Sequence, residues 1–348
     1  MSVIPPFTSF LKALAEQPTL LISSFAAAAM MLVNGWTDAP VAIAPAVNSG
    51  AVGFKKAVMM AAVCNFAGAA AMMAAGNKVA VSIYEISGLS PGGSGSGRAF
   101  AAAMAAVVIW SLFALYFGLP TSEGHALMAA LAGAAARIGS PDAFDGALWA
   151  TVACGVFLST VPTALASAAV AGGIERFIAK KRVSGFRLKK LQVTGAALTC
   201  FAHGAQDGQK FAGVFTVAAA LCMRAPEKTV TVPLWTAILS ALLISSGMLL
   251  GGKKIVKSMG AYTPAEPAAC IAADITASSV LILLSAAGIP VSTTHAKVSS
   301  LMGADLSKRR GSGRCLSLYF RTAAVWLLTF PACAALGFLL AGKIGFEL

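Results

Sequence analysis

Charged side chains inside long apolar stretches are the first chemical feature of this sequence. They are Asp38, Glu123, Asp207, Lys210, Asp274, Lys297 and Arg321. Each costs about 2.5–3.5 kcal/mol at the centre of a membrane-spanning helix, so such groups are normally paired or functional. The chain's three histidines, His125, His203 and His295, lie close to them in sequence. The pattern predicts a polar functional site enclosed within a membrane.

Two short motifs each occur twice along the chain. Asn34–Asp38 (NGWTD) is echoed by His203–Asp207 (HGAQD), and Leu119–His125 (LPTSEGH) is echoed by Ile289–His295 (IPVSTTH). Corresponding residues are 169 or 170 positions apart in both pairs. One offset shared by two separate motifs indicates an internal duplication.

The duplication divides the chain into three predicted parts. Residues 1–173 form a first membrane repeat, residues 191–348 form a second, and residues 174–190 form a basic cytoplasmic linker between them. In the orientation that the charge distribution indicates, the two repeats are inverted. Inverted repeats whose interrupted helices meet near the middle of the membrane are the architecture of secondary transporters.

Asp38 and Asp207 each lie beside an amide and a glycine. The amides are Asn34 and Gln206, and the glycines are Gly35 and Gly204. Carboxylate, amide and carbonyl oxygens bind hard cations, and glycine lets a helix unwind and expose its carbonyls. We therefore predict a cation or proton site, with Asp38 and Asp207 as the metal ligands if the ion is sodium. The alternative is a buried carboxylate that pairs with Lys210 or with a serine or threonine for packing.

Hydroxyl side chains follow a proline in each half and begin an apolar helical segment. They are Ser122 in the first half and Ser292, Thr293 and Thr294 in the second. Hydroxyls, free backbone N–H groups and the positive end of a helix dipole together make an anion site. Serine and threonine also cap helices where no ligand binds. Two such helix starts at one offset favour an oxyanion site.

The remaining buried polar side chains each have two open roles. His125, His203 and His295 either orient the motif turns by hydrogen bonding or titrate. Lys210 either neutralises substrate charge or pairs with an aspartate. Glu123 either joins the carboxylate cluster as a proton carrier or repels a bound anion.

The composition requires a membrane around this site. Hydrophobic residues make up 58% of the chain, charged residues make up 11% and the mean hydropathy is +0.80, whereas a soluble domain has about 25% charged residues. Predicted membrane spans are 19–50, 55–75, 99–118, 145–173, 190–223, 231–251, 266–289 and 315–342. The shorter segments 122–138 and 292–306 are predicted to be broken or re-entrant helices. The expected fold is an all-α polytopic membrane protein of inverted repeats.

The net charge of +13 follows from membrane orientation. With the N-terminus outside, 16 lysines and arginines lie in loops on the cytoplasmic side and seven lie in loops on the other side. This bias is the one expected of a multi-pass protein in the cell membrane, so no nucleic acid partner is needed to explain the charge. No removable signal peptide is evident, and the cysteines show no spacing typical of disulfides or metal sites.

These motifs together resemble the inorganic phosphate transporter (PiT) family in its bacterial form. Asn34–Pro40 and His203–Lys210 resemble its two Gly-x-Asn-Asp-x-x-Asn elements, and Pro290–His295 matches its Pro-x-Ser-Thr-Thr-His element. The resemblance covers about residues 25–340 and implies cation-coupled phosphate symport by alternating access, without a cofactor. The implied partners are inorganic phosphate, sodium or protons, the lipid bilayer and a second copy of the chain in a homodimer.

The resemblance also implies roles for individual residues. Phosphate contacts are implied at Ser122, Ser292, Thr293, Thr294 and Gln209. Cation coupling is implied at Asn34, Asp38, Asn65, Gln206, Asp207 and Asp274. The chain departs from the family pattern at Val41, where an amide ligand is lost, and at Glu123-Gly124, which stand in place of two threonines. The lost ligand and the clustered carboxylates favour protons over sodium as the coupling ion.

Three other functions remain open on the sequence alone. A permease for sulfate or another oxyanion would use the same helix starts, and a divalent metal transporter would use Asp38, Asp207 and Asp274 as oxygen ligands. An intramembrane serine hydrolase would pair Ser122 or Ser292 with a histidine. That option lacks a Gly-x-Ser-x-Gly element, so the chain is not expected to be an enzyme.

Val41→Asn tests the departure in the first motif. Restoring an amide near Asp38 adds an oxygen ligand, so the sodium dependence of phosphate uptake should strengthen more than the phosphate affinity changes. Uptake at graded sodium concentrations measures this. An unchanged sodium response would mean that the first half holds no sodium site of the family type.

Overall fold

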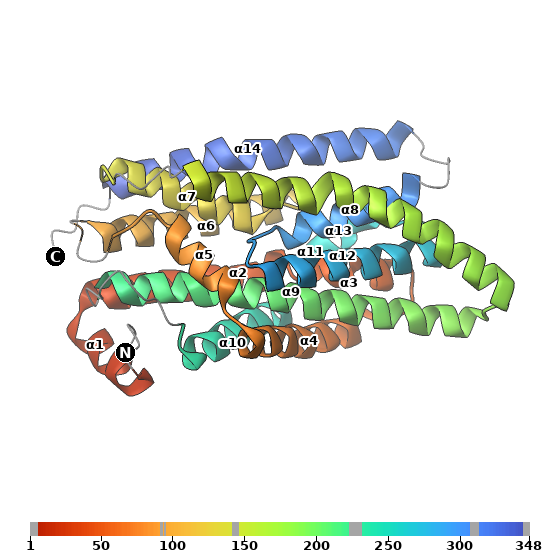
Figure 1. Cartoon of the computed structure of the whole chain (residues 1–348), viewed down its shortest axis with the longest axis horizontal. Helices are drawn as coiled ribbons and strands as arrows, with labels where there is room; N and C mark the ends of the chain where they lie inside the picture. The colour runs from red at the N-terminus through yellow and green to blue at the C-terminus, as the bar shows by residue number, and fades with distance from the viewer. Residues whose placement is uncertain are drawn as a thin grey trace.

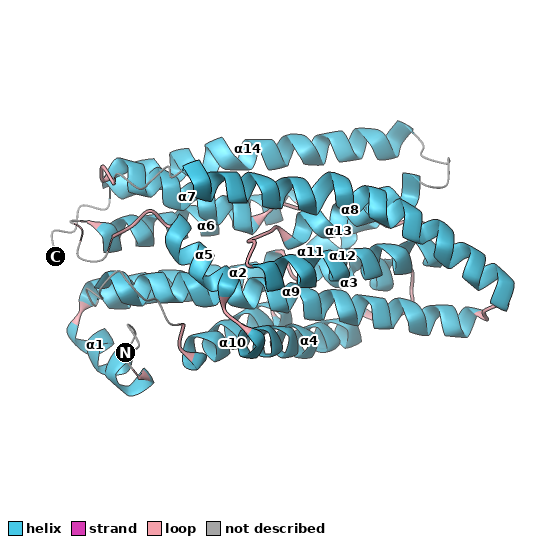
Figure 2. Cartoon of the chain, viewed as in Figure 1, coloured by secondary structure: helices cyan, strands magenta, loops and turns pink. Residues whose placement is uncertain are grey.

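Every regular element in the described part of the chain is a helix, which confirms the all-α prediction (Figures 1 and 2). The structure is a computed structural model, and it describes residues 6–90, 93, 95–140, 146–222, 232–306 and 313–343. The first seven helices in chain order are α1 (Phe7–Glu16), α2 (Pro18–Thr37), α3 (Pro40–Asn48), α4 (Phe54–Ala75), α5 (Lys78–Ile86), α6 (Ser96–Phe117) and α7 (Glu123–Arg137). They are followed by α8 (Gly146–Lys181), α9 (Gly185–Cys222), α10 (Leu234–Leu249), α11 (Lys253–Ser258), the 3₁₀ helix η2 (Met259–Tyr262), α12 (Pro267–Ala287), α13 (Thr293–Leu306) and α14 (Gly313–Lys343).

Six helical segments in the described residues are long and apolar enough to cross a membrane. They are Pro18–Asn48, Phe54–Ala75, Ser96–Phe117, Trp149–Lys181, Pro267–Ala287 and Ser317–Lys343. A seventh span arises if α10 and the helical segment that follows it, Lys253–Tyr262, are counted together; the two meet at a bend of 66°. α9 (38 residues), which covers the predicted span 190–223, is not among these six segments. Its apolar stretch carries the charged motif itself.

The predicted span 19–50 is broken in the middle. α2 ends at Thr37 and α3 begins at Pro40, with Asp38 between them. Proline has no N–H to donate to α2, and its ring clashes with the preceding turn, so the first helix ends there. The cause of the break is therefore Pro40 and not Gly35.

α9 runs without a break through the equivalent motif, so the expected unwinding at Gly204 is wrong. A Cβ on Gly204 would lie 2.0 Å from the Asn65 backbone oxygen, and a Cβ on Gly35 would lie 2.0 Å from that of Ile244. Each motif glycine therefore lets a neighbouring helix approach closely, which is how small residues act inside membranes.

Equivalent helices of the two halves make equivalent contacts with the opposite half. α2 packs against α10 while α9 packs against α4, and α7 packs against α14 while α13 packs against α8. When residue numbers are shifted by the motif offset of 169 or 170, the α2–α10 contact corresponds to the α9–α4 contact, and the α7–α14 contact corresponds to the α13–α8 contact. This correspondence supports the proposed repeats at 1–173 and 191–348.

The basic stretch 174–190 is mostly helical rather than a separate linker. α8 continues to Lys181 and α9 begins at Gly185, so residues 182–184 alone interrupt the helices. Lysine and arginine are good helix formers, which lets the two helices extend through the polar stretch. Their junction projects beyond the other helices at the right of Figure 1.

The two short apolar segments form α7 and α13, each buried along most of its length. The helices before them, α6 and α12, end at Gly118 (φ 67°) and Gly288 (φ 83°). Glycine tolerates this left-handed conformation, so both helices stop there and the chain turns into its Pro-x-Ser element. Two enclosed short helices therefore begin at equivalent places, as the prediction of broken or re-entrant elements requires.

Glycines also set the contact of each short helix with a long one. A Cβ on Gly133 of α7 would lie 2.0 Å from the Ala334 oxygen of α14. A Cβ on Gly303 of α13 would lie 1.9 Å from the Ala164 oxygen of α8. Both members of the second pair lie 170 residues after or before their counterparts in the first. Close backbone approach thus holds the motif helices in both halves.

Gly303→Ala should lower the thermal stability of the folded chain, because the new methyl group forces α13 away from α8. Overpacking of this kind costs about 1–3 kcal/mol. The matched control is Gly173→Ala on α8, where a Cβ meets nothing within 4 Å and alanine favours the helix. Melting curves in detergent measure both variants. Equal midpoints for the two would contradict the close contact.

Candidate functional site

The four motif segments meet in one enclosed place. The break after α2, the middle of α9 and the first turns of α7 and α13 contribute its polar side chains. Those of Asp38, Asp207, His203, Lys210, Glu123, Thr293 and Thr294 are at most 4% exposed. Residues far apart in sequence are therefore brought together away from solvent.

Asp38 is bound by two hydroxyls of the other half. Thr293 Oγ1 donates to Asp38 Oδ2 at 2.9 Å, and Thr294 Oγ1 donates to Asp38 Oδ1. Among the described residues no lysine or arginine lies within ion-pair distance of this carboxylate. Its charge is thus held by hydrogen bonds, and a countercharge has to come from His203 or from a bound cation.

Asp207 has a lysine partner instead. Lys210 Nζ lies 2.6 Å from Asp207 Oδ1 and donates a second hydrogen bond to the Val291 backbone oxygen at 3.1 Å. Asn34 Nδ2 donates to Asp207 Oδ2 at 3.3 Å. The pairing alternative for Lys210 is therefore the one that the structure shows.

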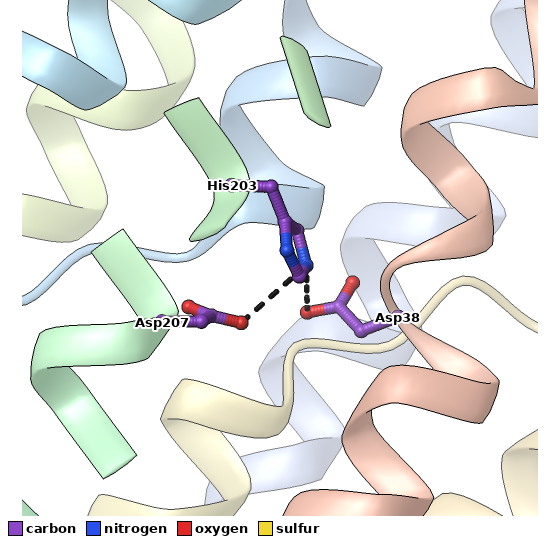
Figure 3. A group of neighbouring side chains, drawn as sticks. All are labelled: Asp38, His203 and Asp207. Atoms are coloured by element: carbon purple, nitrogen blue, oxygen red, sulfur yellow. Dashed lines mark ion pairs between the residues drawn. The ribbon is translucent and has the colours of Figure 1, made fainter. Parts of the chain in front are cut away.

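His203 lies between the two aspartates (Figure 3). Its Nε2 is 3.4 Å from Asp207 Oδ2 and 4.0 Å from Asp38 Oδ2. Its Nδ1 is 2.7 Å from Asn65 Oδ1, and Asn65 Nδ2 donates to the Ala61 oxygen at 2.8 Å. Because the amide nitrogen is committed to Ala61, Nδ1 of His203 is the donor to Asn65.

The His203 ring adds to the concentration of negative charge between the two aspartates when it is neutral. In a neutral imidazole that donates through Nδ1, the lone pair of Nε2 points toward two carboxylates. A proton on Nε2 or a cation in the gap removes that repulsion. One ligand atom from each of Asp38, His203 and Asp207 lies within 4.8 Å of the others, a spacing that suits a single bound ion.

A small cavity adjoins Asp38. Its volume is about 10 Å³, and Val41, His203, Thr293, Thr294 and Lys297 are among its lining residues. The Lys297 ammonium group itself is paired with Asp274. The cavity volume is about the room that one water molecule needs. The space beside the Asp38 carboxylate is therefore enough for one small ligand of about the size of a water molecule.

Ser122 and Ser292 cap the two short helices. Ser122 Oγ accepts a hydrogen bond from the His125 N–H at 3.2 Å, and Ser292 Oγ accepts one from the His295 N–H at 3.1 Å. The hydroxyl protons themselves stay available to a ligand. Both serines therefore act as helix caps, as the alternative predicted. The oxyanion site stays a prediction.

The two helix starts lie against each other. The His125 and His295 rings are 4.3 Å apart between centroids, and His295 also stacks on Trp326 at 3.8 Å. Both imidazoles line an apolar cavity of about 460 Å³ beside α8, α13 and α14. Their ring contacts support an orienting role for both histidines.

Comparison with known proteins places this fold in a family. The sequence model of the phosphate transporter family matches residues 34–187 and again residues 179–337. The chain belongs to the phosphate transporter family. Two successive matches to one family model agree with a duplicated sequence, and the family resemblance drawn from the motifs is confirmed.

Relatives of this phosphate transporter family member share its length. A protein of Bacillus subtilis, named "Probable low-affinity inorganic phosphate transporter", is 28% identical over 315 residues, covering 89% of this chain and 92% of its own. A Rhizobium meliloti protein of the same name is 29% identical over 307 residues, covering 87% and 89%. These relatives are transporters, which confirms a multi-pass membrane protein that is not an enzyme and overturns the serine hydrolase alternative.

A solved structure shares the fold. The chain described as "The sodium-dependent phosphate transporter" superposes with a TM-score of 0.81 at 19% identity, over 95% of this chain and all of that one. At this identity the likeness concerns the fold, and it confirms an inverted-repeat architecture for this family member.

Three predicted site residues lie around this centre without joining it. Gln206 Nε2 donates to the Ile289 oxygen at 3.2 Å, and Gln209 Oε1 accepts from the Val79 N–H at 3.1 Å. Both glutamines thus brace neighbouring backbone. Asp274 forms its own cluster with Lys297 and with Thr199, whose Oγ1 donates at 2.9 Å.

The structure adds two hydroxyls that the sequence analysis did not single out, Thr37 of the first motif and Thr199. Thr37 donates to the Glu123 carboxyl and to the Val33 oxygen at 2.7 Å. Thr199 lies one helical turn before His203 and two before Asp207. That i, i+4, i+8 spacing on one helix face is a signal that could have identified Thr199.

Ser292→Ala should destabilise the chain by about 1 kcal/mol, because an alanine leaves the His295 N–H without its cap. Ser292→Asn should preserve stability, since asparagine caps as well as serine. The same pair of substitutions at Ser122 provides an internal repeat of the test. Thermal unfolding in detergent without phosphate measures the four variants, and equal midpoints for alanine and asparagine would reject the capping role.

Proposed function

We propose that the chain transports inorganic phosphate together with a cation, a proton or sodium, by alternating access. The family match, the names of its relatives and the description of the similar solved structure support phosphate as the substrate. The geometry adds the observation that carries the coupling. Asp38 of the first half is bound by Thr293 and Thr294 at the start of α13 in the second half.

This contact makes cation binding and anion binding depend on each other. The Thr293 and Thr294 hydroxyl protons point to the Asp38 carboxylate while it lacks a countercharge. A cation on Asp38 takes over the carboxylate oxygens and repels those hydroxyl protons. The freed hydroxyls can then donate to phosphate, beside the unpaired N–H groups of the first turn of α13.

The opposed helix starts provide the anion end of the site. The rings of His125 and His295 hold the first turns of α7 and α13 together. Both turns direct their positive dipole ends to the region of the capped serines, so an oxyanion between them is stabilised from two sides. Lys210 lies within hydrogen-bonding reach of the Val291 oxygen just before α13 and adds positive charge there.

The orientation and assembly of the chain complete the proposal. The bias of lysine and arginine toward one set of loops supports an N-terminus outside the cell membrane. A homodimer is proposed as the assembly, by the family resemblance alone. Metal transport is a second candidate, because Asp38, His203 and Asp207 offer three ligand atoms within 4.8 Å.

Phosphate uptake into proteoliposomes tests the proposed function. Purified protein should accumulate radiolabelled phosphate when a sodium or a proton gradient is imposed, and Asp38→Asn should abolish the response, since the amide cannot hold the countercharge. Uptake that is driven by a proton gradient alone would confirm that protons are the coupling ion, as the loss of an amide ligand at Val41 predicts. Glu85→Gln removes an exposed carboxylate and is the matched control.

Three outcomes would contradict the proposal. Phosphate uptake that ignores both gradients would exclude coupling. Accumulation of sulfate in place of phosphate would reassign the substrate to another oxyanion. Uptake of manganese without phosphate, lost in Asp38→Asn, would favour metal transport.

A further inference from the structure

Lys210 occupies a position that its counterpart in the other half leaves apolar. Lys210 follows Asp207 by three residues, as Val41 follows Asp38. Both side chains are buried. The duplicated motif therefore carries an ammonium group beside one aspartate and an isopropyl group beside the other.

The ammonium group of Lys210 lies where a cation would lie. Its oxygen partners are the Asp207 carboxylate at 2.6 Å and the Val291 backbone carbonyl at 3.1 Å. A carboxylate together with a carbonyl from an extended segment is the ligand set of a monovalent cation in secondary transporters. Lysine presents a compact point charge that such oxygens accept equally well.

The first half supplies space for this ammonium group. At the motif offset, Thr294, which binds Asp38, corresponds to Gly124 at the start of α7. A Cβ on Gly124 would lie 3.0 Å from Lys210 Nζ. Glycine at this position thus leaves room for the lysine where the other half has a hydroxyl group.

Asp38 differs from Asp207 in each of these respects. It has two threonine hydroxyls in place of a lysine, and a cavity of about 10 Å³ lies beside it. Nε2 of His203, on a side chain 3% exposed, has no hydrogen-bond partner and lies between the two carboxylates, 4.0 Å from Asp38 Oδ2 and 3.4 Å from Asp207 Oδ2. The first-half site is open to an exchangeable cation and the second-half site is filled by the chain itself.

We infer that Lys210 is a tethered cation that permanently occupies the second of two equivalent cation sites, so that the chain binds only one exchangeable cation, at the Asp38 site. The inference rests on the proposed cation-coupled transport and adds the number of exchangeable cations that one chain binds. A chain with a neutral, shorter residue at position 210 should regain the second site. Asparagine would remove the ammonium group and offer an amide oxygen beside Asp207.

Sodium binding to the purified full-length chain tests this inference. Radiolabelled sodium is titrated in detergent without phosphate, so the result does not depend on transport. The wild type should bind no more than one sodium ion per chain, and Lys210→Asn should bind about one more than the wild type. Lys210→Gln provides the same test if asparagine prevents folding. Adding Asp207→Asn to either variant should remove the gained ion.

Controls separate this result from general effects of losing a lysine. Lys253→Asn removes an exposed lysine and should bind as the wild type does. Elution as a single peak in size-exclusion chromatography establishes that each variant is folded. Two sodium ions bound by the wild type would overturn the inference, and so would a folded variant at position 210 that gains none. Failure of wild-type phosphate uptake would instead count against the proposed function.

Discussion

The structure depends on compensating carboxylate charge inside a low-dielectric interior. Asp38 and Asp207 are almost wholly buried, and an isolated ionised carboxylate is not tolerated there. Each receives a partner from a segment that is distant in sequence, Asp38 from α13 and Asp207 from Asn34, and Asp207 also pairs with Lys210 one turn along its own helix. These contacts join the two halves of the chain, so the site and the packing of the repeats are the same set of interactions.

The rest of the architecture keeps these groups in reach of one another. Glycines at Gly35, Gly204, Gly133 and Gly303 bring backbones into contact across the halves, which is the main source of close packing among helices in lipid. The Gly118 and Gly288 turns end α6 and α12, so that α7 and α13 start inside the protein. A helix start enclosed in this way keeps its polar N–H groups from lipid and offers them to an anion.

Pseudo-symmetry makes the differences between the halves informative. The helix that carries Asp38 is broken by Pro40, whereas α9 continues past Asp207. Asp38 has hydroxyl partners and a small cavity, whereas Asp207 has a lysine. The two equivalent carboxylates thus differ in their partners, and under the proposed cation coupling this asymmetry makes Asp38 the one whose charge varies.

Local patterns in the sequence are enough to establish the class of protein, the duplication and the identity of the central residues, because hydropathy and repeated motifs are read over short stretches. The partner of each polar group emerges only in the folded chain. Lys210 pairs with Asp207 and Lys297 with Asp274, while Ser122 and Ser292 cap helices and the two glutamines brace backbone. The serine caps and the Lys210–Asp207 pair are local, so the sequence offers them as alternatives, whereas the Lys297–Asp274 pair and the glutamine contacts join separate segments of the chain. Their distances are set by close packing across the whole bundle, which no local pattern records.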